Sequence, residues 1–541
     1  MNTPSAHHEP GVARTADAYA IAPLLNCLLR EAAEPTGSAG VHRLRGSGRL
    51  LRVSGGRRPA EPRLGTEDGW QRLNHSELIK LTAEELRLFT GVSNDEVLGE
   101  MIDSRDAIAA VLTARSGAQP PGDPYLCSEQ SLVMGHPAHP APKARSGLPA
   151  GGWLPYAPEV HARFPLVFLG VRADLVAEEG GPGSVRTLDR LDQVLQGPTP
   201  PAGYRLLPAH PWQLDLVGRC TDIRRAFADG RLLRLGPTRR PVWPTASVRT
   251  LYLPDTESDL FLKFSLDVRI TNDVRRLWRH DLVRLRHTDA AVETAFVAVR
   301  TAGSSAAWLC DSGYRTASFA FEELAVLVRE GLHQHLLPRA QPLLAASLAQ
   351  GFDDGPARRT TDPIRWWSAY LRQVVPPVLE VFARHGLVLE AHLQNTVIAV
   401  DSTGTPVQAL FRDAEGVKQV AETGREAAWE RLVYCLVVNH LSEIAATLAE
   451  HHPEVAPALW PAARDEFLRY DAERGLAEIS AMLRAPTIPG KTNLLLRWTG
   501  ADGAESRYRP LPNPLCVEPA ATGARSGAPI PQLGTSHLAG Q

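Results

Sequence analysis

The hydrophobic pattern changes along this chain, and the change restricts the folds open to it. Residues 1–125 carry helical stretches near 18–33 and 76–115, with a Gly- and Arg-rich, hairpin-like piece at 41–55 between them. From 120 to about 300, short apolar runs broken by proline and glycine, such as residues 164–169, are typical of strands. Beyond 319 the helical period prevails, interrupted by one β-hairpin, and predicts helices at 321–339, 366–385, 425–450 and 462–483. The pattern predicts an α+β protein with a helical start, an antiparallel β-rich middle and a largely helical end.

The chain has 541 residues, more than one hydrophobic core usually supports, so we expect roughly three domains that share a cleft. The changes of pattern put these domains at 1–125, 126–318 and 319–517. Residues 518–541 are rich in Gly, Ala, Pro and Ser and have no periodicity. We expect this last segment to be a disordered tail.

Charge and cysteine content exclude several classes of protein. Lys plus Arg number 58 against 60 for Asp plus Glu, which gives no reason to expect nucleic acid or an anionic membrane as partner. The six cysteines are scattered without a CxxC motif, as expected for reduced thiols rather than a disulfide framework or zinc ribbon. No apolar run has membrane-spanning length, and none follows the N-terminus. We therefore expect a cytoplasmic protein without membrane contact.

Lysine is rare: only Lys80, Lys143, Lys263, Lys418 and Lys491 occur among the 58 basic residues. Lysine carries a compact point charge and arginine a planar fork, so a position that keeps lysine can require the ammonium group itself. Lys143 and Lys263 fall inside polar clusters, whereas Lys80 lies in an ordinary helical stretch. The alternative is that a compositional bias replaced most lysines by arginine and that these five lysines remain by chance.

Residues 135–147 read G-H-P-A-H-P-A-P-K-A-R-S-G and combine two histidines, a lysine and an arginine with several prolines. Each proline pushes the residue before it towards extended geometry. With three residues per turn, His136 and His139 then lie on one side. This stretch is either part of a ligand-binding site or a proline-rich surface loop.

Residues 261–271 alternate between apolar and polar side chains, as in a strand with one buried face. The polar face carries Lys263, Ser265, Asp267, Arg269 and Thr271. We expect the strand to run directly into a helix over 272–278, with Thr271 and Arg275 at its N-terminus. The helix dipole and free N–H groups favour an anion there, which would also explain a first-turn arginine. A solvated polar face is the alternative.

Two further clusters carry polar groups suited to a nucleotide. Ser247, Arg249 and Thr250 offer hydroxyls and a guanidinium close together, and with Lys263 they suit phosphate oxygens; a turn with a surface arginine is the alternative. In E-A-H-L-Q-N, residues 390–395, alternation places Glu390, His392 and Gln394 on one face of a predicted strand.

That strand is predicted to continue to 400, turn at 401–405 and return over 407–411. This hairpin brings Asp413 beside Gln394 and Asn395. A carboxylate and an amide oxygen so placed can share Mg²⁺, as kinases do with an Asn and an Asp. The alternative is a pair of half-buried polar residues at the strand ends.

Other motifs fail on their context. Residues 489–492 end like a Walker A loop, but Ala485 replaces the first glycine and prolines flank the loop. His136 and His139 lack the spacing and the glutamate of a zinc protease, and no G-x-S-x-G elbow occurs.

Taken together and in order, several motifs resemble those of the NRPS-independent siderophore synthetases, the IucA/IucC (aerobactin-synthetase) family. They are G-H-P-A-H-P-A-P-K-A-R-S-G, A-H-P-W-Q, S-V-R-T, K-F-S-L-D-V-R-I-T-N-D-V-R, E-A-H-L-Q-N and F-R-D, and the resemblance spans Glu129 to Arg497. It implies a hand-like enzyme with a helical N-terminal thumb, antiparallel β-rich fingers and a largely helical palm that carries a β-hairpin. It also implies a homodimer.

The resemblance implies a role for each cluster. Ser247, Arg249, Thr250 and Lys263 match the triphosphate-binding positions, and Thr271 and Arg275 match catalytic positions that touch both the acyl substrate and the α-phosphate. His392 matches a catalytic residue beside the reacting carboxylate and the ATP, while Gln394 and Asn395 line the nucleotide. Glu390, Asp413 and Asn395 are the Mg²⁺ candidates, and His136, Lys143 and Arg145 match the rim of the carboxylate pocket.

The implied reaction is an ATP- and Mg²⁺-dependent condensation. A carboxylate such as citrate or a citryl monoamide attacks the α-phosphorus, pyrophosphate leaves, and an amine or hydroxyl nucleophile takes the acyl group from the adenylate to form an amide or ester. A kinase-like phosphotransferase and a non-catalytic carboxylate- or siderophore-binding protein are the alternatives. A ferric-siderophore reductase would need four clustered cysteines, whereas only Cys435 and Cys516 lie in the C-terminal region.

Overall fold

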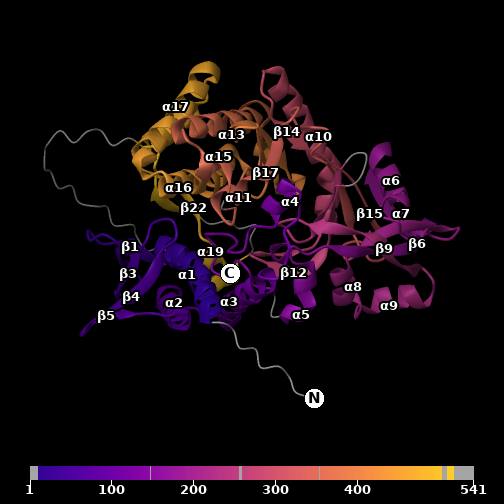
Figure 1. The fold of residues 1–541 in the computed structure, drawn as a ribbon, viewed down its shortest axis with the longest axis horizontal. Coiled ribbons are helices and arrows are strands. Elements are labelled where there is room, and N and C mark those ends of the chain that lie inside the picture. Colours follow the sequence, from indigo (N-terminus) through magenta and orange to yellow (C-terminus); the bar gives the residue numbers. More distant parts are fainter. Residues whose placement is uncertain (1–9, 146–147, 255–258, 353, 502–507, 517–541) are drawn as a thin grey trace, which may run out of the picture.

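The computed structural model describes residues 10–145, 148–254, 259–352, 354–501 and 508–516. In Figure 1 the N-terminal helices and strands lie at the lower left, a sheet with its own helices lies at the right, and the C-terminal helices lie above. The expected tail at 518–541 lies outside the described residues.

The N-terminal part combines long helices with a sheet. Its five antiparallel strands follow each other in order. They are β1 (Ala33–Pro35), β2 (Val41–Leu44), β3 (Leu50–Ser54), β4 (Ala60–Thr66) and β5 (Gly69–Arg72). The predicted hairpin at 41–55 and the flanking helices are confirmed, the helices being α1 (Pro10–Ala32), α2 (His75–Thr90) and α3 (Asp95–Arg115). Helix α2 begins with a capping box, in which Asn74 accepts from the Glu77 N–H at 3.0 Å and Glu77 accepts from the Asn74 N–H at 2.8 Å.

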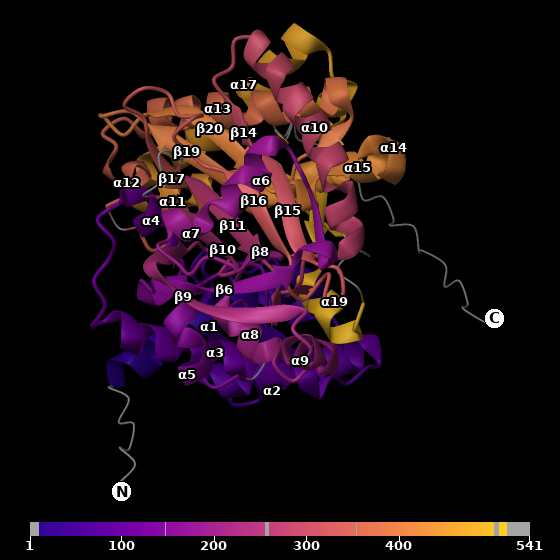
Figure 2. The same ribbon diagram turned by 90° about the vertical axis from the view of Figure 1, so that its right-hand side faces the viewer.

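The middle of the chain forms an eight-stranded sheet in the order β7-β15-β16-β11-β10-β9-β6-β8, with antiparallel pairings throughout. Figure 2 shows these strands side by side. Their bounds are β6 (Phe164–Arg172), β7 (Val176–Gly180), β8 (Tyr204–Ala209), β9 (Leu232–Pro244), β10 (Thr250–Leu253), β11 (Leu260–Phe264), β15 (Asp311–Ala317) and β16 (Val326–Glu330). The predicted strand at 164–169 is confirmed.

The helix predicted at 321–339 is wrong, because β16 occupies its centre. Val326, Leu327 and Val328 are all buried, since β16 lies inside the sheet between β11 and β15. A short apolar run that is covered on both faces has no period that separates strand from helix. The pattern over 321–339 therefore could not distinguish the two.

The single strand predicted over 261–271 is two strands in different sheets, β11 and β12 (Leu266–Ile270). The chain turns away at Ser265, whose hydroxyl donates to the Glu322 carbonyl and accepts from the Leu277 N–H at 3.0 Å. Strand β12 then pairs with β13 (Asp273–Arg275) in a hairpin. The helix expected over 272–278 is therefore absent, and α10 (Arg279–Thr301) begins only after Trp278.

The C-terminal part packs helices on a sheet of order β14-β20-β19-β17. The predicted hairpin is confirmed as β19 (Thr396–Val400) and β20 (Pro406–Arg412); the other strands are β14 (Ala307–Leu309) and β17 (Gln341–Leu344). The helix at 366–385 is confirmed as α13 (Pro363–His385). The helix at 425–450 is confirmed as α15 (Arg425–Val433), a π-helical segment (Tyr434–Leu441) and α16 (Ser442–His451).

The helix predicted at 462–483 is two helices, α17 (Ala456–Arg474) and α18 (Ala477–Arg484). Gly475 separates them with a φ of 71°, a left-handed conformation that ends α17. Shorter elements complete the fold: α4 (Pro124–Glu129), α5 (Ala150–Trp153), α6 (Pro182–Asp189), α7 (Leu191–Val194), α8 (Pro211–Val217), α9 (Thr221–Ala228), α11 (Ala345–Ala349), α12 (Pro356–Arg359), β18 (Leu387–Val388), β21 (Lys418–Gln419), α14 (Val420–Thr423), β22 (Thr487–Lys491), α19 (Asn493–Thr499) and β23 (Tyr508–Pro512).

One helical span, Arg425–His451, is long and apolar enough to cross a membrane by length and composition, but 78% of its apolar window is buried inside the protein. It is a core helix of the C-terminal part, where Leu436, Val437 and Leu441 are fully buried. Its burial explains its hydropathy.

Candidate active site

The structure brings every sequence-predicted site residue to the wall of one cavity, which has a volume of about 290 Å³ and is called the main cavity below. These residues come from distant parts of the sequence. They are His136, Lys143, Arg145, Ser247, Arg249, Thr250, Lys263, Thr271, Arg275, Glu390, His392, Gln394, Asn395 and Asp413. Their individual roles stay predictions.

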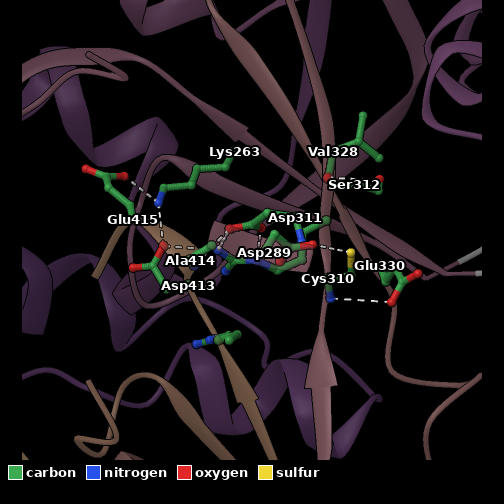
Figure 3. Close-up of polar contacts among 12 residues, drawn as sticks. Lys263, Asp289, Cys310, Asp311, Ser312, Val328, Glu330, Asp413, Ala414 and Glu415 are labelled. Atoms are coloured by element: carbon green, nitrogen blue, oxygen red, sulfur yellow. Dashed lines mark hydrogen bonds and ion pairs between the residues drawn. The ribbon is translucent and has the colours of Figure 1, made fainter. Parts of the chain in front are cut away.

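The phosphate cluster, defined as Ser247, Arg249, Thr250 and Lys263, lies where β10 begins and pairs with β11. Lys263 stands opposite Thr250 in this register. Its Nζ lies 2.6 Å from Asp413 Oδ1 and 2.7 Å from Glu415 Oε2 (Figure 3). Glu415 also lies 3.1 Å from an Arg249 nitrogen. The cations predicted for phosphates are therefore held in place by two carboxylates.

Two residues of this region escaped the sequence analysis. Glu415 follows Asp413 by two positions, and this D-x-E spacing was the available signal. Arg329 comes from β16, which the pattern presented as a helix, so nothing in the sequence connected it with the site. It lies 3.1 Å from Asp413 Oδ1 and lines the main cavity. Burial opposes ionisation of Asp413, but Lys263 and Arg329 hold the pKa of that carboxyl far below its usual range.

Thr271 and Arg275 lie on the β12–β13 hairpin and not at a helix N-terminus, so that part of the prediction is wrong. Thr271 takes a φ of 60° in the turn. The Arg275 guanidinium donates to the Thr271 hydroxyl and to the Ile270 carbonyl, each at 2.7 Å. Arg275 forms no ion pair within the part of the chain that the structure describes. Burial and the neighbouring Arg249 lower the pKa of Arg275, so its charged form gains from an anionic ligand.

The His–Pro stretch forms one wall of the main cavity. His136 Nδ1 accepts from the Ala138 N–H at 3.0 Å, so its Nε2 carries the proton, while His139 is also tied to Asn272 Oδ1 at 3.2 Å. Burial lowers the pKa of both histidines to about 3, and both are neutral at pH 7. His136 therefore offers an N–H donor rather than a cation.

Lys143 and Arg145 line the main cavity but share a buried partner that the sequence analysis missed, Glu159. Lys143 Nζ contacts Glu159 Oε1, and an Arg145 nitrogen lies 3.0 Å from the same oxygen. Burial opposes ionisation, but these two cations hold the pKa of Glu159 at about 2. The N-terminal part anchors the segment as well, because the Lys143 N–H donates to Ser104 Oγ at 3.0 Å. The lysine and arginine thus already neutralise one carboxylate.

Residues 390–395 form a loop, and the strand predicted there begins only at Thr396. The His392 N–H donates to the Glu390 carbonyl at 2.8 Å and the Asn395 N–H donates to the His392 carbonyl at 3.0 Å, a turn that brings the chain from β18 into β19. The predicted proximity of Asn395 and Asp413 is supported by the adjacent contact, in which the Arg412 N–H donates to the Asn395 carbonyl at 3.1 Å. Glu390 pairs with Arg431.

A second cavity of about 130 Å³, called the side cavity, adjoins the main one. Both are lined by His136, Thr271, Glu390, His392 and Asn439. Lys491, the lysine of the rejected Walker-like motif, lines the side cavity, and its ammonium group forms no ion pair within the described ranges. Arg431 and Lys491 are the basic groups of the described lining and Glu390 is its acidic group, so basic side chains outnumber acidic ones there. Burial lowers the pKa of Lys491, and the nearby Glu390 opposes this shift.

Within the described residues, no group of three or more His, Cys, Asp or Glu side chains is arranged to hold a metal ion. Any magnesium site here must therefore combine one or two carboxylates with amide oxygens, water or phosphate.

The chain matches two family models and is similar to several named proteins. The model of the IucA / IucC family matches residues 124–350, and that of the ferric iron reductase FhuF-like transporter matches residues 364–506. An L-2,3-diaminopropanoate–citrate ligase of Staphylococcus aureus is 29% identical over 446 residues, 73% of this chain and 75% of that protein. The rhizobactin siderophore biosynthesis protein RhbC of Rhizobium meliloti is 29% identical over 515 residues, 84% of this chain and 87% of that protein.

Solved structures share the fold. ATP-bound aerobactin synthetase IucA from Klebsiella pneumoniae superposes with a TM-score of 0.77 at 22% identity, covering 92% of this chain and 100% of that one. The petrobactin biosynthesis protein AsbB of Bacillus anthracis gives 0.76 at 17% identity, covering 94% and 96%. With its sequence-predicted site residues on one cavity and a match to the IucA / IucC family model over residues 124–350, the chain is similar to the IucA/IucC proteins.

Proposed function

We propose that this chain is an ATP-dependent siderophore synthetase. It adenylates a polycarboxylate such as citrate or a citryl monoamide and condenses the acyl group with an amine or hydroxyl nucleophile, releasing AMP and pyrophosphate. One observation carries the proposal: two adjoining cavities share a wall, one with a phosphate-type cation cluster and the other with an ammonium group that has no carboxylate partner among the described residues. Relatives named as citrate ligases support the choice of carboxylate.

In the first step, a substrate carboxylate oxygen attacks the α-phosphorus of ATP and the bond to pyrophosphate breaks. Arg249 and Lys263 stabilise the charge that moves onto pyrophosphate, because fixed cations in a buried site act without reorganising. Arg275 is hydrogen-bonded to Thr271, which lines both cavities. In this arrangement Arg275 faces two anions that otherwise repel each other, the carboxylate and the α-phosphate. Its charge lowers that repulsion.

In the second step, the nucleophile attacks the acyl carbon, the bond to AMP breaks, and the nucleophile loses a proton. His392 lies on the wall shared by the two cavities. Burial lowers its pKa below the usual value for histidine, so it is neutral at pH 7 and able to accept that proton. We assign it this role.

The acyl substrate occupies the side cavity. Lys491 supplies an ammonium group for one carboxylate, and the His136 N–H supplies a donor for another. The sequence analysis assigned the carboxylate site to Lys143 and Arg145, but Glu159 already neutralises charge on these two residues. We therefore assign the carboxylate to Lys491 instead. Lys143 and Arg145 then shape the wall of the main cavity.

Asp413, Asn395 and Glu415 offer oxygen atoms of the kind that Mg²⁺ prefers, so these residues fit a magnesium site. Bound there, Mg²⁺ would neutralise the triphosphate. Glu390, the remaining sequence-predicted ligand, is paired with Arg431 and is the weaker candidate.

Release of pyrophosphate by the purified protein tests the proposal. With Mg-ATP and hydroxylamine as surrogate nucleophile, we expect pyrophosphate and AMP with at least one member of a panel of citrate, citryl monoamides, 2-oxoglutarate and succinyl-hydroxamates. ADP in place of AMP would indicate a kinase-like phosphotransferase, and binding without turnover a non-catalytic protein. Either outcome would overturn the synthetase proposal.

Variants at the reacting groups sharpen this test. We expect Arg275→Ala and His392→Ala each to lower turnover by about 10²–10³-fold, the usual cost of removing one catalytic group. His287→Ala, at an exposed histidine of α10, is the matched control and should keep full activity. Near-normal turnover of Arg275→Ala or His392→Ala would remove that residue from the mechanism. A homodimer and a cytoplasmic location stay predictions.

A further inference from the structure

Behind Asp413, strands β15 and β16 carry a buried ion pair that the reaction scheme above does not use. Asp311 is fully buried and Arg329 is 3% exposed. The guanidinium engages both carboxylate oxygens, at 2.6 and 3.0 Å, and the two residues stand opposite each other in the β15–β16 register. A buried ion pair stabilises a fold less than well-packed apolar residues of the same volume often do. Stability alone is therefore a poor reason for its presence.

The pair holds the Asp413 segment at two points. Arg329 donates to Asp413 Oδ1 at 3.1 Å. The Ala414 N–H donates to Asp311 Oδ2 at 3.1 Å (Figure 3). The first contact fixes the side chain of Asp413 and the second fixes the backbone that follows it.

This double contact matters because Asp413 has a strained backbone. Its φ is 88° and its ψ is 81°, in a region that residues other than glycine rarely adopt and that costs of order 1–3 kcal/mol. The conformation directs the chain from β20 into the turn at Ala414–Gly416 and so places Glu415 beside Lys263. Contacts with neighbouring residues must therefore hold Asp413 in this conformation.

Asp311 itself is held from the far side by α10. Asp289 accepts from the Asp311 N–H at 3.0 Å and from Trp308 Nε1 at 2.7 Å, and it also contacts Cys310 Sγ. A continuous series of contacts therefore runs from α10 through Asp311 and Arg329 to Asp413 at the cavity wall.

We propose that Asp311 and Arg329 are positioning residues that hold Asp413 and Glu415 in the arrangement needed for the metal–nucleotide complex. The inference rests on the proposed function for the identity of that complex. The positioning itself rests on contacts between the two strands and the Asp413 turn. Neither residue needs to touch the substrate for this role.

Asp311→Asn tests the proposal, because asparagine has the same size and keeps an oxygen for the Ala414 N–H but loses the charge that engages Arg329. We expect the Mg²⁺ concentration for half-maximal pyrophosphate release to rise about tenfold or more, the usual effect of a partner that orients a metal ligand. Saturating Mg²⁺ should restore most of kcat. Arg329→Lys should give an intermediate shift, and it replaces Asp311→Asn if the latter fails to fold.

Arg315→Gln is the matched control. Arg315 is a fully buried arginine on the same strand as Asp311, but it pairs with Glu178 and Asp189 away from the cavity. We expect this variant to lower Tm without changing the Mg²⁺ requirement. Equal losses of Tm in Asp311→Asn and Arg315→Gln with unchanged Mg²⁺ dependence in both would show that the Asp311–Arg329 pair is only structural.

Hydrogen exchange separates this inference from the proposed function. In the protein without nucleotide, we expect the peptide over residues 411–417 to exchange at least several-fold faster in Asp311→Asn than in the parent protein, and to be unchanged in Arg315→Gln. This measurement needs no turnover. Unchanged exchange would overturn the positioning role, whereas absence of pyrophosphate from the parent protein would count against the proposed function alone.

Discussion

Two of the chain's rare lysines occupy the site in different electrostatic states. Lys263 is surrounded by Asp413 and Glu415, whereas Lys491 lines the side cavity without a carboxylate partner among the described residues. A cation that the protein does not neutralise favours an anionic ligand. This difference is why we propose Lys491 as the residue that binds a carboxylate of the acyl substrate.

Lys491→Met keeps the length of the side chain and removes its charge. We expect KM for the carboxylate substrate to rise about 10–100-fold, since a hydrogen bond to a charged group contributes about 1.5–3 kcal/mol. KM for ATP should change less than about twofold. Steady-state kinetics of pyrophosphate release, with each substrate varied in turn, measure both constants.

Lys80→Met is the control for this substitution, because Lys80 is exposed on α2. It should leave both constants unchanged. An unaltered carboxylate KM in Lys491→Met would place the acyl substrate elsewhere.

Site residues were predictable where several polar or charged side chains lie close together in a short stretch of sequence. Residues 135–145 and 390–395 each carry several polar groups at close spacing, and both reach the main cavity. Glu159 and Arg329 were missed because their partners lie outside their own stretches of sequence and no motif marks either residue. Lys491 was named among the five lysines and lies in a motif that fails for a P-loop, and nothing local connects that motif with a carboxylate.

Two elements show where the apolar pattern was sufficient to predict secondary structure and where it was not. The period of residues 366–385 is that of a helix with one apolar face, and α13 confirms it. Residues 326–328 are buried on both sides within the sheet, so their pattern carries no period. The hairpin at Thr271 was missed for a different reason: a strand that ends in polar residues resembles a helix start until the pairing of β12 with β13 is known.

The π-helical segment Tyr434–Leu441 supports the loop over 390–395 from behind. His440 is fully buried, and its Nδ1 donates to the Ala391 carbonyl at 2.7 Å while its Nε2 accepts from the Tyr370 hydroxyl. Burial lowers the pKa of His440 to about 4, so it is neutral at pH 7. π-helical turns frequently lie at functional sites. Here the segment fixes the backbone between Glu390 and His392.

His440→Leu removes the donor to Ala391 and leaves that buried carbonyl without its partner. We expect a loss of about 1–3 kcal/mol in the free energy of unfolding, from the unsatisfied groups, together with a fall in kcat of tenfold or more as His392 loses its support. Denaturant titration and kcat at saturating substrates measure the two effects. Tyr370→Phe, which keeps the contact with Ala391, should keep kcat within about threefold; equal falls in kcat for the two variants would contradict support through Ala391.

At the scale of the whole molecule, the two ends of the chain share a core. Leu494 and Trp498 of α19 belong to the same apolar cluster as Leu24 and Leu28 of α1. Figure 1 shows the two helices near each other. Glu31, in the last turn of α1, accepts from the Leu494 N–H at 3.0 Å and from the Leu495 N–H at 2.8 Å. Lys491 and Asn493 immediately precede these residues and line the side cavity. The N-terminal part thereby holds the segment that carries Lys491 to the side cavity.

Glu31→Ala leaves the first N–H groups of α19 without an acceptor. We expect the free energy of unfolding to fall by about 1–3 kcal/mol, as for other buried donors that lose their partner. Glu84→Ala is the control, because Glu84 is half exposed and forms a surface ion pair with Arg49, so its loss should cost less than about 1 kcal/mol. Urea titration of both variants measures the difference, and equal effects would show that Glu31 does not anchor α19.

The shared core of α1 and α19 also sets an order of events during synthesis. Glu31 and Leu494 are 463 residues apart, so a long stretch of chain is synthesised between α1 and its packing partners in α19. Until α19 is made, Leu24 and Leu28 lack part of their cover, and the growing chain exposes an apolar surface. Completion of this core is therefore a late event, and it follows translation of the segment that brings Lys491 to the side cavity.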